Sequence, residues 1–109
     1  MKETNQNRVV YVTTKSYENA IHISRILLYE KLAACCSITQ GATSIFEWEG
    51  QIEERIECIM TIKTHVDKLE TLETRVKELH LDKVPEIISV VIDSASEEYL
   101  DWMNSVLVN

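Results

Sequence analysis

The chain has few of the residues that interrupt regular structure, because only two glycines and one proline occur among its 109 residues. With 45% hydrophobic and 27% charged residues, the composition excludes a disordered chain or a fibrous repeat. This length fits one domain with one core. We predict a flexible N-terminal segment over residues 1–7 and a single domain over residues 8–109.

Missing patterns exclude several classes of function. No glycine-rich phosphate loop, HExxH or GxSxG is present, so the common catalytic signatures do not apply. The net charge of −7 and the lack of a Lys/Arg cluster argue against nucleic acid. No apolar run approaches the roughly 20 residues that cross a membrane. The first eight residues, MKETNQNR, are polar and lack an apolar stretch, so we expect no secretion signal. Three cysteines without CxxC spacing fit reduced thiols, so we expect a cytoplasmic protein.

Hydrophobic periodicity predicts the order strand, helix, strand pair, helix, strand, helix. The first half should contain a strand over 8–14, a helix from 17 capped by Ser16, and a strand ending near 41. A hairpin that turns at 49–50 should follow, and then a helix from Thr64. The chain should end with a strand over 86–92 that is buried on both faces and a helix capped by Ser94 and Glu97. This order is the ferredoxin-like plan, in which both helices of a split βαβ pair cover one face of an antiparallel sheet.

Two apolar faces follow from the spacing. The first helix should bury Tyr17, Ala20, Ile21, Ser24, Leu27 and Leu28. The returning hairpin strand should bury Ile56, Cys58, Met60 and Ile62. Ile26, Ile45 and Ile59 lie off these faces, which predicts an oligomer that packs sheet against sheet.

The ordered segments LAACCSI, GATSIFEWEGQIEE, IKT, HLDKVPEI and EYLDWM resemble the signatures of the CutA family, which is named for divalent-cation tolerance. The resemblance runs from about Arg8 to near the C-terminus. It implies an α+β ferredoxin-like subunit, a split βαβ sandwich with an additional C-terminal helix, that assembles as a PII-like homotrimer. It also implies a non-enzymatic protein of divalent metal ion (copper) tolerance with no obligatory cofactor.

The chain departs from the family at candidate copper ligands. The family usually has His-Pro-Tyr where this chain has His80-Leu81-Asp82. Family members that bind copper carry a cysteine and a second histidine where Val12 and Leu79 stand here. Only His80 remains as an imidazole ligand, so we expect weak binding of copper or another divalent cation at His80.

The resemblance also implies a cleft between subunits. We expect its lining to be Cys35, Trp48, Lys63, His80 and Glu86, with Tyr99 and Trp102 nearby. An imidazole, an ammonium, a carboxylate and aromatic walls are typical of a small-ligand pocket. The alternative function is therefore a PII-like signalling or scaffold trimer that holds a small anionic ligand on Lys63. Lys63 and Glu86 could equally form a structural ion pair.

Each candidate site residue also has a purely structural explanation. Cys35 could be a small buried hydrophobe, and Trp48 could simply pack beside the hairpin turn. His22 and His65 lie on a helix surface and at a helix start, where solvated side chains are usual. LHLDKVPEI could be only a helix-to-strand connection, since Pro85 favours extended backbone before it.

Overall fold

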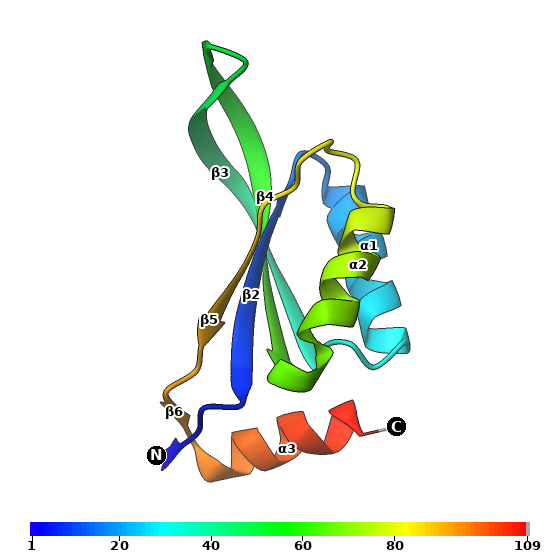
Figure 1. The fold of residues 1–109 in the computed structure, drawn as a ribbon, viewed down its shortest axis with the longest axis vertical. Helices are drawn as coiled ribbons and strands as arrows, with labels where there is room; N and C mark the ends of the chain where they lie inside the picture. Colours follow the sequence, from blue (N-terminus) through cyan, green and yellow to red (C-terminus); the bar gives the residue numbers. More distant parts are fainter. Residues whose placement is uncertain (109) are drawn as a thin grey trace.

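Four antiparallel strands form one sheet in the order β3-β4-β2-β5 in the computed structural model, which describes residues 1–108 (Figure 1). The strands are β2 (Asn7–Thr14), β3 (Cys35–Trp48), β4 (Gln51–His65) and β5 (Ile87–Val91). Helices α1 (Tyr17–Tyr29) and α2 (Leu69–Leu79) lie on the same face of this sheet, which confirms the ferredoxin-like plan. Helix α3 (Glu97–Leu107) lies across one end of the sheet.

The core lies between the sheet and the two helices. From the sheet, Val10, Val12, Met60 and Ile62 are almost completely buried, and from the helices Ile23, Leu27, Leu72 and Val76 meet them. A smaller cluster of Ala34, Leu100, Met103 and Leu107 packs α3 against the sheet. No helix in residues 1–108 has both the length and the apolar content that a membrane span requires.

Helix α1 begins as predicted but is rotated from the expected face. The Ser16 hydroxyl accepts a hydrogen bond from the Asn19 amide at 3.1 Å, which is a standard N-cap. Ile23 is fully buried, whereas Tyr17 and Leu28, which we expected to be buried, are 41% and 42% exposed. Apolar residues at two overlapping helical spacings allowed both rotations, and packing against the sheet selected the one that contains Ile23.

Strand β3 continues through Gly41 instead of ending there. Thr39 pairs with Ile59 and Ala42 with Glu57, so β3 carries one extra residue in a β-bulge at this point. Gly41 has a φ of 81°, which glycine adopts without strain and which lets the strand bend and continue. The expectation of two separate strands therefore mistook a bulge for a turn.

The hairpin turn lies where it was predicted. Trp48 pairs with Gln51, and Glu49 and Gly50 have φ values of 51° and 80°. Two positive φ values in a two-residue loop are the geometry of a type I′ turn. The outer hairpin projects well beyond the helices (Figure 1), and Ile56, which we expected to be buried, is 65% exposed there.

Strand β5 is an edge strand and is not buried on both faces. It pairs only with β2, and it covers a shorter range than the predicted 86–92. Ile88, Val90 and Val91 are each about half exposed within this single chain. An apolar sequence of this kind fits a strand buried on both faces, which requires a covering layer that one chain does not supply.

The start of the second helix differs from the prediction. Strand β4 runs to His65, and a 3-10 turn (η1, Val66–Lys68) precedes α2. His65 Nδ1 accepts from the Asp67 amide at 3.2 Å, while the Thr64 hydroxyl donates to the Leu32 carbonyl at 2.7 Å in the interior. Thr64 therefore does not cap the helix, because its hydroxyl is used in this interior hydrogen bond.

The C-terminal helix is capped two residues later than predicted. The Ser96 hydroxyl accepts from the Tyr99 amide, whereas Ser94 belongs to strand β6 (Ser94–Ala95). Strand β6 pairs with β1 (Lys2–Glu3), which lies inside the segment expected to be flexible. That segment also supplies Asn7 to β2, where its Nδ2 donates to Asn104 Oδ1 at 2.8 Å.

Candidate functional site

His80 ends α2 and is almost buried, with 9% of its surface exposed. Its Nδ1 accepts a hydrogen bond from the Asp82 amide at 2.9 Å, which leaves Nε2 to donate to the Thr13 carbonyl at 2.7 Å. Both ring nitrogens are therefore used within the chain. A metal ion would have to displace one of these partners.

The Asp82 amide that reaches His80 belongs to a residue whose carboxylate lies between two cations. Arg55 Nη2 is 2.7 Å from Asp82 Oδ2, and Lys15 Nζ is 3.9 Å from Asp82 Oδ1. Arg55 also donates from Nε to Glu57 Oε2 at 3.1 Å, and its guanidinium lies over the Phe46 ring at 5.6 Å. The hydrogen bond to Asp82 raises the pKa of Arg55 above its ordinary value.

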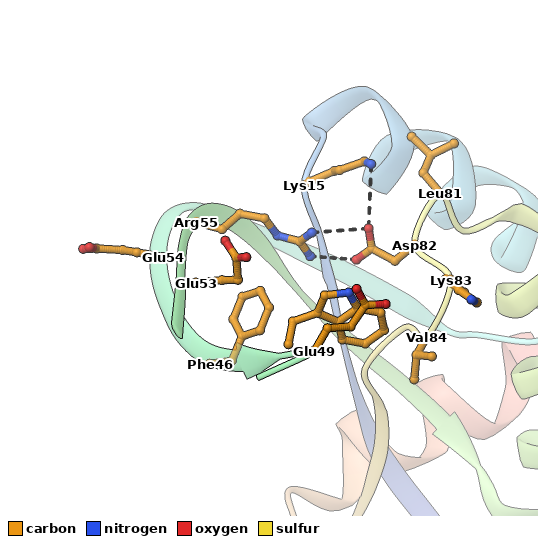
Figure 2. A pocket seen from close by; sticks show the side chains of 11 residues that line it. Lys15, Phe46, Glu49, Glu53, Glu54, Arg55, Leu81, Asp82, Lys83 and Val84 are labelled. Atoms are coloured by element: carbon orange, nitrogen blue, oxygen red, sulfur yellow. Dashed lines mark hydrogen bonds and ion pairs between the residues drawn. The ribbon is translucent and has the colours of Figure 1, made fainter. Parts of the chain in front are cut away.

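A cavity of about 500 Å³ lies beside this network, between the outer hairpin and the connection from α2 to β5 (Figure 2). Its walls combine aromatic and apolar side chains, three cations and four carboxylates: Phe46, Trp48, Leu81 and Val84; Lys15, Arg55 and Lys83; and Glu49, Glu53, Glu54 and Asp82. Charged groups beside an aromatic wall are typical of a site for a small polar ligand.

Four of the predicted cleft residues meet elsewhere. Cys35 and Lys63 pair across β3 and β4, and Lys63 Nζ is 4.0 Å from Cys35 Sγ. The same ammonium lies 6.0 Å from the centre of the Tyr99 ring, and that ring is 5.4 Å from Trp102. The side chains therefore form a continuous group on β3, β4 and α3.

The remaining predicted residues do not join this group within one chain. Trp48 lines the cavity near the hairpin turn, and His80 adjoins the connection that forms the other wall. Glu86 is exposed before β5 and makes no ion pair with Lys63 in the described chain. Within one chain, the predicted cleft residues therefore do not form a single site.

Sequence reasoning missed Lys15, Arg55, Glu57 and Asp82. Glu57 alternates along its strand with the residues that we expected to be buried, yet only 5% of its own surface is exposed. The one available signal was the charged run in LHLDKVPEI, which gives no indication that Arg55 lies opposite it 27 residues away. Residues 1–108 bring no three Cys, His, Asp or Glu side chains together as a ready metal site.

Comparison with known proteins settles the family. Residues 8–106 match the family model described as CutA1 divalent ion tolerance protein. The chain belongs to the CutA1 family. Among CutA1 relatives, the divalent-cation tolerance protein CutA of Thermus thermophilus is 42% identical over 95 residues, which are 87% of this chain and 92% of that protein.

Other CutA1 relatives agree in sequence and in structure. Protein CutA, chloroplastic, of Arabidopsis thaliana is 38% identical over 97 residues, which cover 89% of this chain and 53% of that protein. The crystal structure of CutA from Xylella fastidiosa superposes with a TM-score of 0.92 at 33% identity, covering 96% of this chain and 100% of that one. These matches confirm the resemblance and the fold inferred from the sequence motifs.

Proposed function

We propose that the chain acts as a homotrimeric, non-enzymatic CutA1 protein that contributes to divalent-cation tolerance by binding such ions weakly. Family membership over nearly the whole chain supports the tolerance role. We also infer a cytoplasmic location, supported by three free cysteines, although the Arabidopsis relative is named chloroplastic.

Exposed apolar surface is the observation that best supports assembly into a trimer. On the outer hairpin, Ile45 and Ile52 are 68% and 73% exposed, and β5 offers Ile88 and Val90 along an unpaired sheet edge. Such an edge and such a surface favour association with another chain. Copies of this chain supply matching apolar surface, which supports self-assembly.

Sedimentation at micromolar concentration tests the assembly, and we expect a trimer. Val90→Arg places a charge on the exposed edge and should yield smaller species, because burying an unpaired charge is costly. Tyr29→Arg is the matched control, since Tyr29 is 91% exposed at the far end of α1 and should leave the trimer intact. A wild-type monomer would contradict the proposal.

Weak cation binding is the chemistry that the charges support. The chain has a net charge of −7, and carboxylates attract divalent cations, whereas copper prefers imidazole. His80 is the proposed copper ligand, and it must first release the Asp82 amide or the Thr13 carbonyl. That competition should keep the affinity low.

Calorimetric titration with copper, with the thiols blocked, tests the ligand. We expect weak binding that decreases toward acidic pH, because a metal ligand must be deprotonated. His80→Gln should lose most of the signal, while His22→Gln, on the exposed face of α1, should retain it. Equal binding by the wild type and His80→Gln would remove His80 and leave carboxylates as the ligands.

The second candidate function is a PII-like sensor or scaffold that holds a small anion between subunits. Lys63 favours it, because its ammonium makes no ion pair with a carboxylate in the described chain and lies against Tyr99. Trimerisation could complete a cleft from the Lys63 group of one subunit and the Trp48 group of another. A copurified organic anion that survives chelation and is lost in Lys63→Gln would favour this function over the first.

A further inference from the structure

The Asp82 carboxylate occupies a position where an external anion could bind. We propose that Arg55 and Lys15 form an oxyanion site, and that the connection over residues 81–84, here called the strap, blocks it with Asp82. Figure 2 shows both cations directed at this one carboxylate, at 2.7 Å from Arg55 Nη2 and 3.9 Å from Lys15 Nζ. The strap would therefore be an internal competitor of the ligand.

Arg55 has supporting contacts that do not involve the strap. Its Nε donates to Glu57, two residues away on the same strand, and Phe46 supports the face of the guanidinium. The Glu57 side chain is 4% exposed, and Arg55 is its ion-pair partner. A guanidinium fixed in this way keeps its fork of donors in the geometry that carboxylates and phosphates accept.

The strap, by contrast, is weakly attached. Leu81 and Val84 are 59% and 67% exposed, so hydrophobic packing contributes little to its position. Asp82 is tied to the rest of the chain by its cation contacts and by the bond from its amide to His80 Nδ1. Lys15, with half of its side chain exposed, is a loose partner. Release of Asp82 would thus leave Arg55 in position.

The cavity decides which anions could enter. Arg55 and Lys15 line a space of about 500 Å³ whose wall includes the strap itself, and Glu57 offsets one of their two positive charges. Glu49 and Glu53 on the hairpin side repel a highly charged ligand. The site therefore suits a small oxyanion of low charge, either a carboxylate or a phosphate.

This inference goes beyond the proposed function and can fail separately from it. The oxyanion site uses neither Lys63, which would hold the anion in the second candidate function, nor the apolar surfaces that would form the trimer. Failure of the oxyanion site would leave the sedimentation result, and so the proposed assembly, unaffected.

Titration of strap variants with sodium acetate and with inorganic phosphate, at constant ionic strength, tests the site. Trp48 lines the cavity and reports binding by its fluorescence in a Trp102→Phe background. A strap that is closed about 90% of the time lowers apparent affinity about tenfold, so Asp82→Ala should bind at least about ten times more tightly than Asp82 protein. The anion that gains more identifies the ligand class as carboxylate or phosphate.

Matched variants show whether the two cations carry the effect. Adding Lys15→Gln to Asp82→Ala should weaken binding, and Arg55→Lys should weaken it further. Lys83→Gln removes the same charge from the same cavity, but the Lys83 ammonium points away from Asp82 in Figure 2 and binding should persist. A folded Asp82→Ala protein with no gain, or a gain that survives Lys15→Gln combined with Arg55→Lys, would overturn the proposal.

The wild-type protein provides a test that needs no strap variant. The Asp82 amide is protected by its bond to His80, so an anion that displaces the strap should accelerate hydrogen exchange at this amide. Exchange that stays constant while acetate and phosphate are raised to saturating concentration would refute a blocking role for Asp82. Asp82→Asn, which keeps the shape of the side chain, replaces Asp82→Ala if the latter does not fold.

Discussion

Replacing Arg55 with methionine should greatly reduce the free energy of unfolding, because it leaves the Glu57 carboxylate buried. In the described chain, Arg55 supplies the hydrogen bonds that Glu57 receives, from Nε and Nη2. Methionine retains much of the volume and the contact with Phe46 but offers no donor. The change therefore tests the burial of one charge rather than the loss of a side chain.

The magnitude follows from how deeply each partner lies. Breaking a buried ion pair by removing one partner costs about 3–5 kcal/mol. Glu57 is 4% exposed at its side chain but Arg55 is 32% exposed, so the lower end, about 3 kcal/mol, applies here. Arg75 and Glu30 form an equally direct pair at 3.0 Å with 30% and 38% exposure, and Arg75→Met should cost much less because solvent screens this pair.

Urea unfolding at pH 7 and one fixed protein concentration measures both variants, because assembly makes stability depend on concentration. With a slope of about 1–3 kcal/mol per molar urea, a loss of about 3 kcal/mol lowers the midpoint by about 1–3 M. The double variant Arg55→Met/Glu57→Leu should recover most of the loss, since an apolar pair can replace a buried ionic one. Equal losses for Arg55→Met and Arg75→Met would refute the reasoning.

Two further predictions concern thiols and the core. Desolvation raises the pKa of the Cys36 thiol to about 11, so only about one molecule in a thousand carries its thiolate at pH 8. Mass spectrometry should therefore find Cys35 alkylated by iodoacetamide well before Cys36. The reverse order would contradict this prediction. Ile23→Ala should cost about 2–5 kcal/mol in the same urea assay and Leu28→Ala less than about 1 kcal/mol, because only Ile23 is fully buried; similar costs would contradict the observed rotation of α1.

Local chemistry predicted the elements whose signals do not depend on neighbours. The Ser16 cap and the turn at Glu49-Gly50 each follow from the preferences of one or two residues. The order of such elements then restricts an α+β chain to few topologies. The family resemblance reached the same fold independently.

Contacts between distant segments were beyond that reasoning. Arg55 and Asp82 meet only because the hairpin twists toward the connection after α2, and nothing in either local sequence encodes that meeting. Thr64 and Ser94 both suit a helix N-cap by local rules. In the structure, the Thr64 hydroxyl instead makes a buried hydrogen bond, and Ser94 belongs to a short strand. The apolar β5 sequence was interpreted correctly as a strand and incorrectly as buried, since burial depends on what surrounds a single chain.

The bulge at Gly41 changes the direction of the hairpin without changing which residues pair on either side of it. Thr39 with Ile59 and Ala42 with Glu57 are joined by one more residue in β3 than in β4. Deleting Gly41 would therefore restore a regular ladder and leave every pair on either side unchanged, while the bend and the added twist would disappear. A change in length at this one position, rather than a substitution, is the means by which related chains could redirect the hairpin, and with it the wall that carries Phe46 and Trp48, without altering any strand register.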